Sequence, residues 1–148
     1  MFSPDLYEFV KLLIEKEVEY LIVGGYAVGI HGHPRYTGDL DVWINPTKEN
    51  AEKVLETVNQ FGFSYFNFKV EDFITEGNVI QLGNPPLRID LLTEIDGVKF
   101  DECFLNTKEV NIDNLMVKFI SYKDLIKNKL STGRHRDLDD IENLNPPK

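Results

Sequence analysis

The chain has 148 residues, of which 42 % are hydrophobic and 28 % are charged, and its net charge is −9 at pH 7. This length and composition are typical of a globular protein with a hydrophobic core, so we expect residues 1–148 to form a single domain. The negative charge excludes a surface that binds a nucleic-acid backbone over its whole area. The single cysteine, Cys103, excludes an internal disulfide and a cysteine-rich zinc site.

No segment has the pattern of a secretion signal or of a membrane span. Residues 1–20 are acidic and lack both the basic start and the unbroken apolar stretch of a signal peptide. No later run reaches the roughly 18 consecutive apolar residues that a membrane span needs. We therefore expect a cytoplasmic protein with no membrane partner.

The first half of the chain alternates predicted helices and strands. Ser3 and Pro4 are typical of a helix start, and apolar residues recur after them at helical spacing. A short apolar run then stops at Gly24-Gly25, as a strand does before a tight turn. The predicted elements are a helix over 4–16, a strand over 20–23, a helix over 26–31, a strand over 40–44, and a helix between a cap at Thr47 and a stop at Gly62.

The second half contains more predicted strands. Apolar runs are separated by Gly-Asn-Pro-Pro, by Asp-Gly and by residues 111–114, all typical of hairpin turns. Ser121, with Asp124 three residues later, is typical of a capped helix start. The predicted elements are strands over 79–82, 88–92, 98–104 and 115–120, followed by helices over 122–130 and 136–144. Together they predict an α/β (α+β) fold, a mixed β-sheet flanked by helices with a helical C-terminus.

Two aspartates stand in the second predicted strand, within the sequence RYTGDLDVWI at 35–44. Residues i and i+2 of a strand share a face, so Asp39 and Asp41 point the same way about 6.6 Å apart. Two like charges at this spacing need a cation between them, and Mg²⁺ and Mn²⁺ prefer oxygen ligands. Asp90 stands in another apolar run, RIDLL. If its strand lies beside the first, the three carboxylates can hold two metal ions, as in phosphoryl-transfer sites.

Gly24 and Gly25 lie between a predicted strand and a predicted helix. Their N–H groups carry no side chain that would block a polyphosphate, and the helix dipole adds a favourable field. The order G-x-G-x-x-G of a dinucleotide-binding fold is absent, and Ile30-His31 stand where a P-loop has Lys-Ser/Thr. Taken alone, such glycines are more often turn residues than phosphate ligands.

Three other groups of residues have alternative interpretations. His31 and His33 could be metal ligands, but the flanking glycine and proline favour a helix end where imidazoles cap or pack. Trp43 and the aromatic run at 61–68 indicate core or sheet surface, and an exposed member could stack on a base. Basic residues gather near the end of the chain, as phosphate contacts or as the solvated face of a helix. They are Lys123, Lys127, Lys129, Arg134 and Arg136.

With these residues in place, the sequence resembles the nucleotidyltransferase superfamily related to DNA polymerase beta. That pattern is a Gly-Gly or Gly-Ser helix start, an Asp-x-Asp pair and a later third Asp. Within it, GGYAVGIHGHPRYTGDLDVWI and SYKDLIKNKLSTGRHRDLDDI look like the small bacterial proteins akin to AbiEii-type toxins, which are paired with antitoxins. The match runs from about residue 20 to 141, and its first block is the more specific.

The resemblance implies a role for each matching residue. Asp39, Asp41 and Asp90 would hold two Mg²⁺ or Mn²⁺ ions, and Asp90 would also help to deprotonate the attacking hydroxyl. The predicted nucleotide-binding residues are Gly24, Gly25, Arg35, Thr37, Lys129 and Arg134. Gly25 departs from the Gly-Ser variant, because it leaves that phosphate contact to the backbone alone.

The predicted activity is therefore metal-dependent transfer of a nucleoside monophosphate from an NTP to a hydroxyl, with release of pyrophosphate. The acceptor could belong to RNA or tRNA, to a protein or to a small molecule, and the chain could be the toxin-like member of a toxin–antitoxin pair with an antitoxin-like partner. The alternative is a catalytically inactive nucleotide- or partner-binding module of the same fold.

Overall fold

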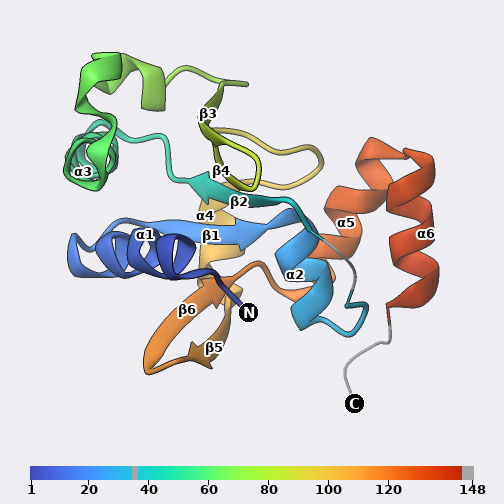
Figure 1. Cartoon of the computed structure of the whole chain (residues 1–148). Helices are drawn as coiled ribbons and strands as arrows, with labels where there is room; N and C mark the ends of the chain where they lie inside the picture. The colour runs from blue at the N-terminus through green and yellow to red at the C-terminus, as the bar shows by residue number, and fades with distance from the viewer. Residues whose placement is uncertain (35–36, 145–148) are drawn as a thin grey trace.

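The computed structural model describes residues 1–34 and 37–144, which form a six-stranded mixed β-sheet with helices around it (Figure 1). The strand order is β3-β4-β2-β1-β6-β5. β1 is parallel to β6, β2 is parallel to β4, and the other neighbouring pairs are antiparallel. The strands are β1 (Tyr20–Val23), β2 (Asp39–Ile44), β3 (Val79–Asn84), β4 (Leu87–Leu92), β5 (Lys108–Ile112) and β6 (Leu115–Phe119).

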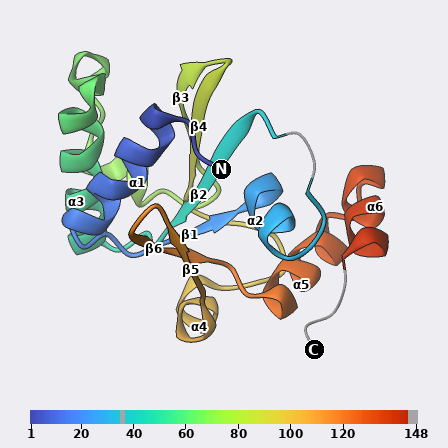
Figure 2. The same cartoon turned by 60° about the horizontal axis from the view of Figure 1, so that its bottom comes forward.

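The helices form two groups. α1 and α3 pack beside each other against the sheet, whereas α5 and α6 form a pair at the end of the sheet where α2 lies (Figures 1 and 2). The helices are α1 (Pro4–Glu15), α2 (Gly24–Ile30), α3 (Lys48–Val58), α4 (Phe100–Cys103), α5 (Tyr122–Thr132) and α6 (His135–Asn143). Short π and 3-10 turns cover Asn59–Phe63, Ser64–Phe66, Val70–Phe73 and Phe104–Asn106. Among the described residues, no helix combines the length and apolar character that crossing a membrane requires.

The three helix starts predicted from capping residues are confirmed by their caps, whereas α2 begins at Gly24, two residues before the predicted start. The hydroxyls of Ser3, Thr47 and Ser121 accept hydrogen bonds from the backbone N–H three residues later, at the starts of α1, α3 and α5. Each cap satisfies one of the N–H groups that a helix start leaves without a partner. Gly133 ends α5 in the left-handed conformation, with φ 63°.

The core lies between the sheet and its helices. All four residues of β1 are buried. The buried apolar face of α1 consists of Leu6, Phe9, Val10 and Leu13. Burial of this much apolar surface is the main favourable term in folding. The predicted mixed sheet flanked by helices, with a helical C-terminus, is confirmed.

One predicted element is wrong, and one predicted turn is shorter than expected. The strand predicted over 98–104 is instead the helical turn α4, because Phe100 and Cys103 share one buried helical face and Phe100 packs edge-on against Trp43, with ring centroids 5.1 Å apart. The turn predicted over 111–114 is shorter: Asp113 and Asn114 alone have positive φ there, and β5 extends up to Ile112. β5 was missed because it is an edge strand in which Ile112 alone is buried.

Candidate active site

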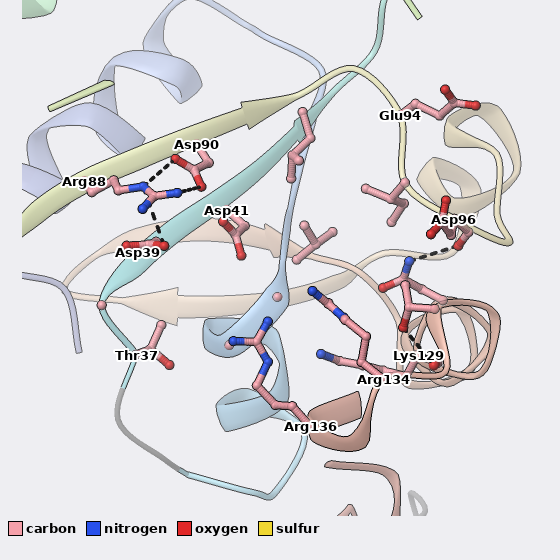
Figure 3. Close-up of a pocket in the computed structure, with 18 residues that line it drawn as sticks. Thr37, Asp39, Asp41, Arg88, Asp90, Glu94, Asp96, Lys129, Arg134 and Arg136 are labelled. Carbon is pink, nitrogen blue, oxygen red and sulfur yellow. Dashed lines mark hydrogen bonds and ion pairs between the residues drawn. The ribbon is translucent and has the colours of Figure 1, made fainter. Parts of the chain in front are cut away.

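A cavity of about 790 Å³ opens where β2 and β4 face α5 and α6 (Figure 3). Its lining includes every predicted site residue except Arg35, which lies outside the described residues. One side carries the carboxylates of Asp39, Asp41 and Asp90, here called the carboxylate wall. The opposite side carries Lys129, Arg134 and Arg136, here called the cationic wall. Also in the lining are Val23, Gly24, Gly25, Thr37, Gly38, Arg88, Leu92, Glu94, Ile95, Asp96, Asn128 and Thr132.

The carboxylate wall is set by strand register. β2 and β4 run parallel with Asp41 directly opposite Asp90, so their side chains share one face of the sheet. Asp39, two residues before Asp41, lies on the same face and opposite Arg88. The prediction that the strand of Asp90 lies beside that of Asp39 and Asp41 is therefore confirmed, and one cavity collects all three side chains.

Arg88 bridges these carboxylates. Its Nε donates to Asp90 Oδ1 at 3.0 Å and its Nη2 to Asp90 Oδ2 at 2.9 Å, while Nε lies 3.6 Å from Asp39 Oδ2. Such a bidentate pair is among the stronger ionic contacts in proteins. One guanidinium cannot balance three carboxylates, so this wall keeps an excess of negative charge.

Burial and this excess of negative charge both act on the pKa of Asp41. Burial, followed by the nearby charges of Asp90 and Asp39, raises the pKa of Asp41 to about 6. A carboxyl group with this pKa is close to half-protonated under mildly acidic conditions. A cation placed between the carboxylates would lower the pKa again, because it favours the ionised form.

Two side chains press against Gly24 and Gly25, the first two residues of α2, here called the glycine turn. Gly24 has φ 67°, and a Cβ at this position would overlap the carboxylate of Asp41. A Cβ on Gly25 would lie 2.5 Å from Thr37 Oγ1. Both glycines are therefore required by close approach, at the first position by backbone conformation as well. The turn, Thr37 and Asp41 thus meet at one edge of the cavity.

Buried ion pairs hold the cationic wall together. Lys129 Nζ lies 2.9 Å from Asp137 Oδ1 and 3.1 Å from Asp140 Oδ2, and the three side chains are 5 %, 0 % and 1 % exposed. Arg134 Nε donates to Asp137 Oδ2 at 2.7 Å. Burial alone would raise the pKa of Asp137, but hydrogen bonds from Arg134, Thr132 and Lys129 outweigh it and lower the pKa well below its usual range.

Comparison with known protein families assigns the chain to a family. Residues 3–146 match the family described as nucleotidyl transferase of unknown function (DUF2204). The chain belongs to this family. No curated protein matches the chain in sequence.

Solved structures show how widely the fold of this DUF2204 chain occurs. A Thermotoga maritima protein provisionally assigned as a nucleotidyltransferase is 13 % identical, with a TM-score of 0.61 over 96 % of this chain and 93 % of that one. The lincosamide antibiotic adenylyltransferase LnuA, solved with lincomycin bound, is 14 % identical, with a TM-score of 0.55 over 97 % and 96 %. The antibiotic-resistance factor ANT(2'')-Ia is 12 % identical, with a TM-score of 0.57 over 93 % and 79 %. At these identities the likeness establishes a shared fold.

Several residues of the cavity were missed from the DUF2204 sequence. Arg88 stands two residues before Asp90 in a strand, and this spacing alone places both on one face. Asp137 and Asp140, the buried partners of Lys129 behind the cavity lining, are three positions apart on α6, the spacing of one helical face, which is a second usable signal. Glu94 and Asp96, in the loop after β4, have no pattern that marks them.

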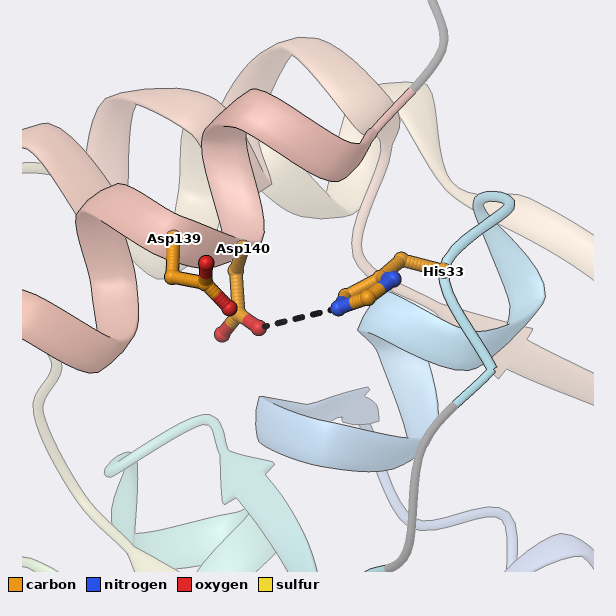
Figure 4. A group of neighbouring side chains, drawn as sticks. All are labelled: His33, Asp139 and Asp140. Atoms are coloured by element: carbon orange, nitrogen blue, oxygen red, sulfur yellow. Dashed lines mark ion pairs between the residues drawn. The ribbon is translucent and has the colours of Figure 1, made fainter.

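His31 and His33 lie outside the cavity lining and have different surroundings. His31 Nε2 is 2.8 Å from the carbonyl oxygen of Ile120, and its ring packs edge-on against Tyr122, so it packs at a helix end as predicted. His33 lies near Asp139 and Asp140, with potential ligand atoms within 4.8 Å of one another (Figure 4). These three groups could hold a metal ion, but Asp140 Oδ2 already contacts Lys129. His33 Nε2 lies 4.0 Å from Asp140 Oδ1, which brings the loop before β2 next to this cluster.

Proposed function

We propose that the cavity transfers a nucleoside monophosphate from an NTP to a hydroxyl acceptor and releases pyrophosphate. The observation that carries this proposal is the convergence of Asp39, Asp41 and Asp90 on one cavity beside the glycine turn. Membership of a nucleotidyl transferase family supports it. The finer resemblance to AbiEii-like proteins belongs to the same proposal, as does a single catalytic domain over residues 1–148.

The carboxylate wall fits a pair of divalent cations. Its donors are carboxylate oxygens, which Mg²⁺ and Mn²⁺ prefer. The pKa of Asp41 is raised first by burial and then by the charges of Asp90 and Asp39, which Arg88 offsets only in part. Metal ions held by Asp39, Asp41 and Asp90 would stabilise charge on the attacking and leaving oxygens. The donor set thus supports a metal-dependent reaction.

The residues of the chain supply the remaining steps. Asp90 accepts the proton of the attacking hydroxyl through an oxygen that Arg88 releases, since both oxygens are engaged by the guanidinium in this structure. The acceptor oxygen then forms a bond to the α-phosphorus, and the bond from that phosphorus to the bridging oxygen of the β-phosphate breaks. The negative charge of the leaving pyrophosphate is stabilised by the glycine turn and the cationic wall.

The nucleotide-binding residues remain those predicted from the sequence. We place the triphosphate against Gly24, Gly25, Thr37 and Arg134, with Lys129 at the base of the same wall. Arg35 keeps its predicted role. The turn can approach a phosphate closely because neither glycine has a side chain.

The acceptor hydroxyl belongs on the side of the cavity lined by Leu92, Glu94, Ile95 and Asp96. The carboxylates of Glu94 and Asp96 disfavour an RNA backbone there and favour an uncharged or amine-bearing small molecule or a protein side chain. A small acceptor is compatible with the shared fold of the lincosamide antibiotic adenylyltransferase LnuA, solved with lincomycin bound, and the antibiotic-resistance factor ANT(2'')-Ia. RNA and tRNA ends are the competing acceptors in the test below.

The toxin-like role and the antitoxin-like partner stay predictions from the sequence. They are tested by expressing the chain alone and together with the neighbouring gene of its genome. Growth arrest that is relieved by the neighbour, with co-purification of the two proteins, is the expected outcome. Normal growth with the wild-type chain expressed alone would contradict the toxin role.

Transfer itself is tested with purified protein, each NTP labelled at the α-phosphate, and Mg²⁺ or Mn²⁺. Acceptors are offered as total RNA, a cell-protein extract and a panel of hydroxyl-bearing small molecules including aminoglycosides and lincosamides. We expect metal-dependent transfer of label that Asp39→Asn abolishes and that Asp101→Asn, an exposed aspartate on α4, leaves intact. If no label moves and Asp39→Asn binds Mg²⁺–NTP as tightly as the wild type, the inactive nucleotide-binding module is the correct function.

A further inference from the structure

The three side chains of the cationic wall differ in how much of their charge is already balanced. Lys129 is enclosed by two buried carboxylates, at 2.9 and 3.1 Å. Arg134 directs its Nε and Nη2 toward Asp137, at 2.7 and 3.4 Å. Arg136 lines the cavity, yet among residues 1–34 and 37–144 it has no ion pair and no side-chain hydrogen bond. The least compensated cation of this wall is therefore Arg136.

The position of Arg136 in α6 is also electrostatically unfavourable. α6 begins at His135, so Arg136 is the second helical residue, and Arg134 occupies the cap without a capping hydrogen bond from its side chain. Cations at a helix N-terminus are disfavoured by the helix dipole, which stabilises anions there. A conflict of this kind between local preference and sequence is typical of functional sites. Figure 3 shows the guanidinium extending from α6 into the cavity, on the side where Thr37 lies.

Lys129 differs from Arg136, because separating its ammonium group from Asp137 and Asp140 would cost free energy. Its side chain is 5 % exposed, and moving it toward a phosphate would leave Asp137 and Asp140 buried next to one cation fewer. Breaking a buried ion pair in this way is strongly destabilising. The same contacts tie α5 to α6 and so fix where α6 begins. Lys129 therefore determines where Arg136 stands without having to touch a ligand.

We infer that Arg136 is the principal cation for the β- and γ-phosphates of the NTP, and that Lys129 is a positioning residue that holds α6 in place through Asp137 and Asp140. The inference rests on the proposed transfer reaction and refines its phosphate site. Arg136 then distinguishes ligands that carry these phosphates from ligands that lack them. An NTP or free pyrophosphate reaches Arg136, whereas a nucleoside monophosphate does not.

Binding of three probes to the purified protein tests this inference: Mg²⁺–NTP, Mg²⁺–pyrophosphate and NMP, each measured by calorimetry. Arg136→Gln is expected to weaken the first two by roughly 10- to 100-fold, the loss expected for a charged hydrogen bond, and to leave NMP binding and the unfolding temperature unchanged. Lys127→Gln, an exposed cation on α5 outside this cavity, is the matched control and should bind all three like the wild type. Arg136→Lys should recover part of the loss.

Lys129→Met separates positioning from contact. We expect a lower unfolding temperature and a loss of pyrophosphate binding that adds little when Arg136→Gln is already present, because both changes act on the same contact. Unchanged pyrophosphate binding in Arg136→Gln would overturn the inference and leave the proposed function standing. A wild type that binds neither NTP nor pyrophosphate with Mg²⁺ or Mn²⁺ would instead overturn the proposed function.

Discussion

The two walls of the cavity differ in how far the charges of their side chains are compensated. In the carboxylate wall, strand register forces Asp39, Asp41 and Asp90 onto one face, Arg88 compensates them only in part, and the pKa of Asp41 rises to about 6. In the cationic wall, by contrast, buried ion pairs lower the pKa of Asp137. One wall holds unbalanced charge that an outside cation can relieve, whereas the other balances Lys129 and Arg134 with buried carboxylates and, among the described residues, leaves Arg136 uncompensated. The unbalanced groups, which include Arg136, are the ones expected to meet ligands.

The largest effect is expected from removing the cation at the centre of the buried ion pairs. Lys129→Met leaves Asp137 and Asp140 buried without their shared partner, and we expect a loss of about 3 to 5 kcal/mol of unfolding free energy. Urea unfolding followed by circular dichroism measures it. Lys127→Met changes the same residue type on the exposed side of α5 and should stay within about 0.5 kcal/mol of the wild type. Equal stabilities of these two variants would mean that Lys129 does not balance these carboxylates.

The carboxylate wall should respond to charge removal in the opposite direction. Asp41→Asn removes one of the like charges, so the metal-free protein should gain roughly 1 to 3 kcal/mol of stability at pH 7.5. Nucleotidyl transfer should fall more than about 100-fold, since even outer-shell partners of metal ligands are worth 10- to 100-fold. Urea unfolding in EDTA and the labelled-NTP assay measure the two effects. A variant that is both less stable and inactive would indicate a structural role for Asp41.

The pH dependence of stability separates the two walls without mutation. The pKa of Asp41 is raised from 3.8 to about 6, so the folded protein binds this proton more tightly than the unfolded chain does. Its contribution is complete below about pH 4 and is lost as the pH rises to about 6. The pKa of Asp137 is lowered, so its contribution is present above pH 4 and is lost on acidification.

Thermal unfolding between pH 4 and 8, with EDTA or with Mn²⁺, measures this dependence. The stabilisation by Mn²⁺ should grow between pH 5 and 7, because the ion competes with the proton on Asp41. In Asp41→Asn the fall in stability between pH 4 and 6 should be smaller than in the wild type. A Mn²⁺ effect that is the same at pH 5 and pH 7 would count against metal binding at the carboxylate wall.

The fold was predictable where a local pattern decides the outcome. Capped helix starts and apolar strands such as β1 were located correctly, because capping and burial leave a signal within a few residues. The sequence predicts a strand where the helical turn α4 lies, since a short apolar run suits either structure until its packing against Trp43 is known. β5 has little apolar alternation, and its pairing with β6 identifies it as a strand.

The carboxylate wall was more predictable than the cationic wall. Alternation along β2 was enough to place Asp39 and Asp41 on one face, and the apolar surroundings of Asp90 marked it as unusual. The environment of Lys129 depends on how α6 packs against α5, which no spacing within α5 reveals. For that reason the sequence could suggest that Lys129 and Arg134 contact phosphate but could not show that buried carboxylates enclose Lys129.

The smallest effect concerns the glycine turn that joins the walls. Gly25→Ser puts a Cβ 2.5 Å from Thr37 Oγ1, so it should displace the Thr37 side chain and raise the KM for NTP about tenfold. Thr37→Ala removes the hydroxyl and should have a similar effect. Combined, the two changes relieve most of the overlap and place a hydroxyl on residue 25 instead, so the double variant should lose less than the sum of the single losses.

Steady-state kinetics of the four proteins of this cycle give the coupling between positions 25 and 37. Gly29→Ala is the matched control: its Cβ would meet nothing within 4 Å, so this variant should keep the KM and gain a few tenths of a kcal/mol to about 1 kcal/mol from helix propensity. Strictly additive losses in the double variant would show that Thr37 and the turn act on the nucleotide separately. Non-additive losses would show that the hydroxyl of Thr37 acts in the place that a side chain on residue 25 would occupy.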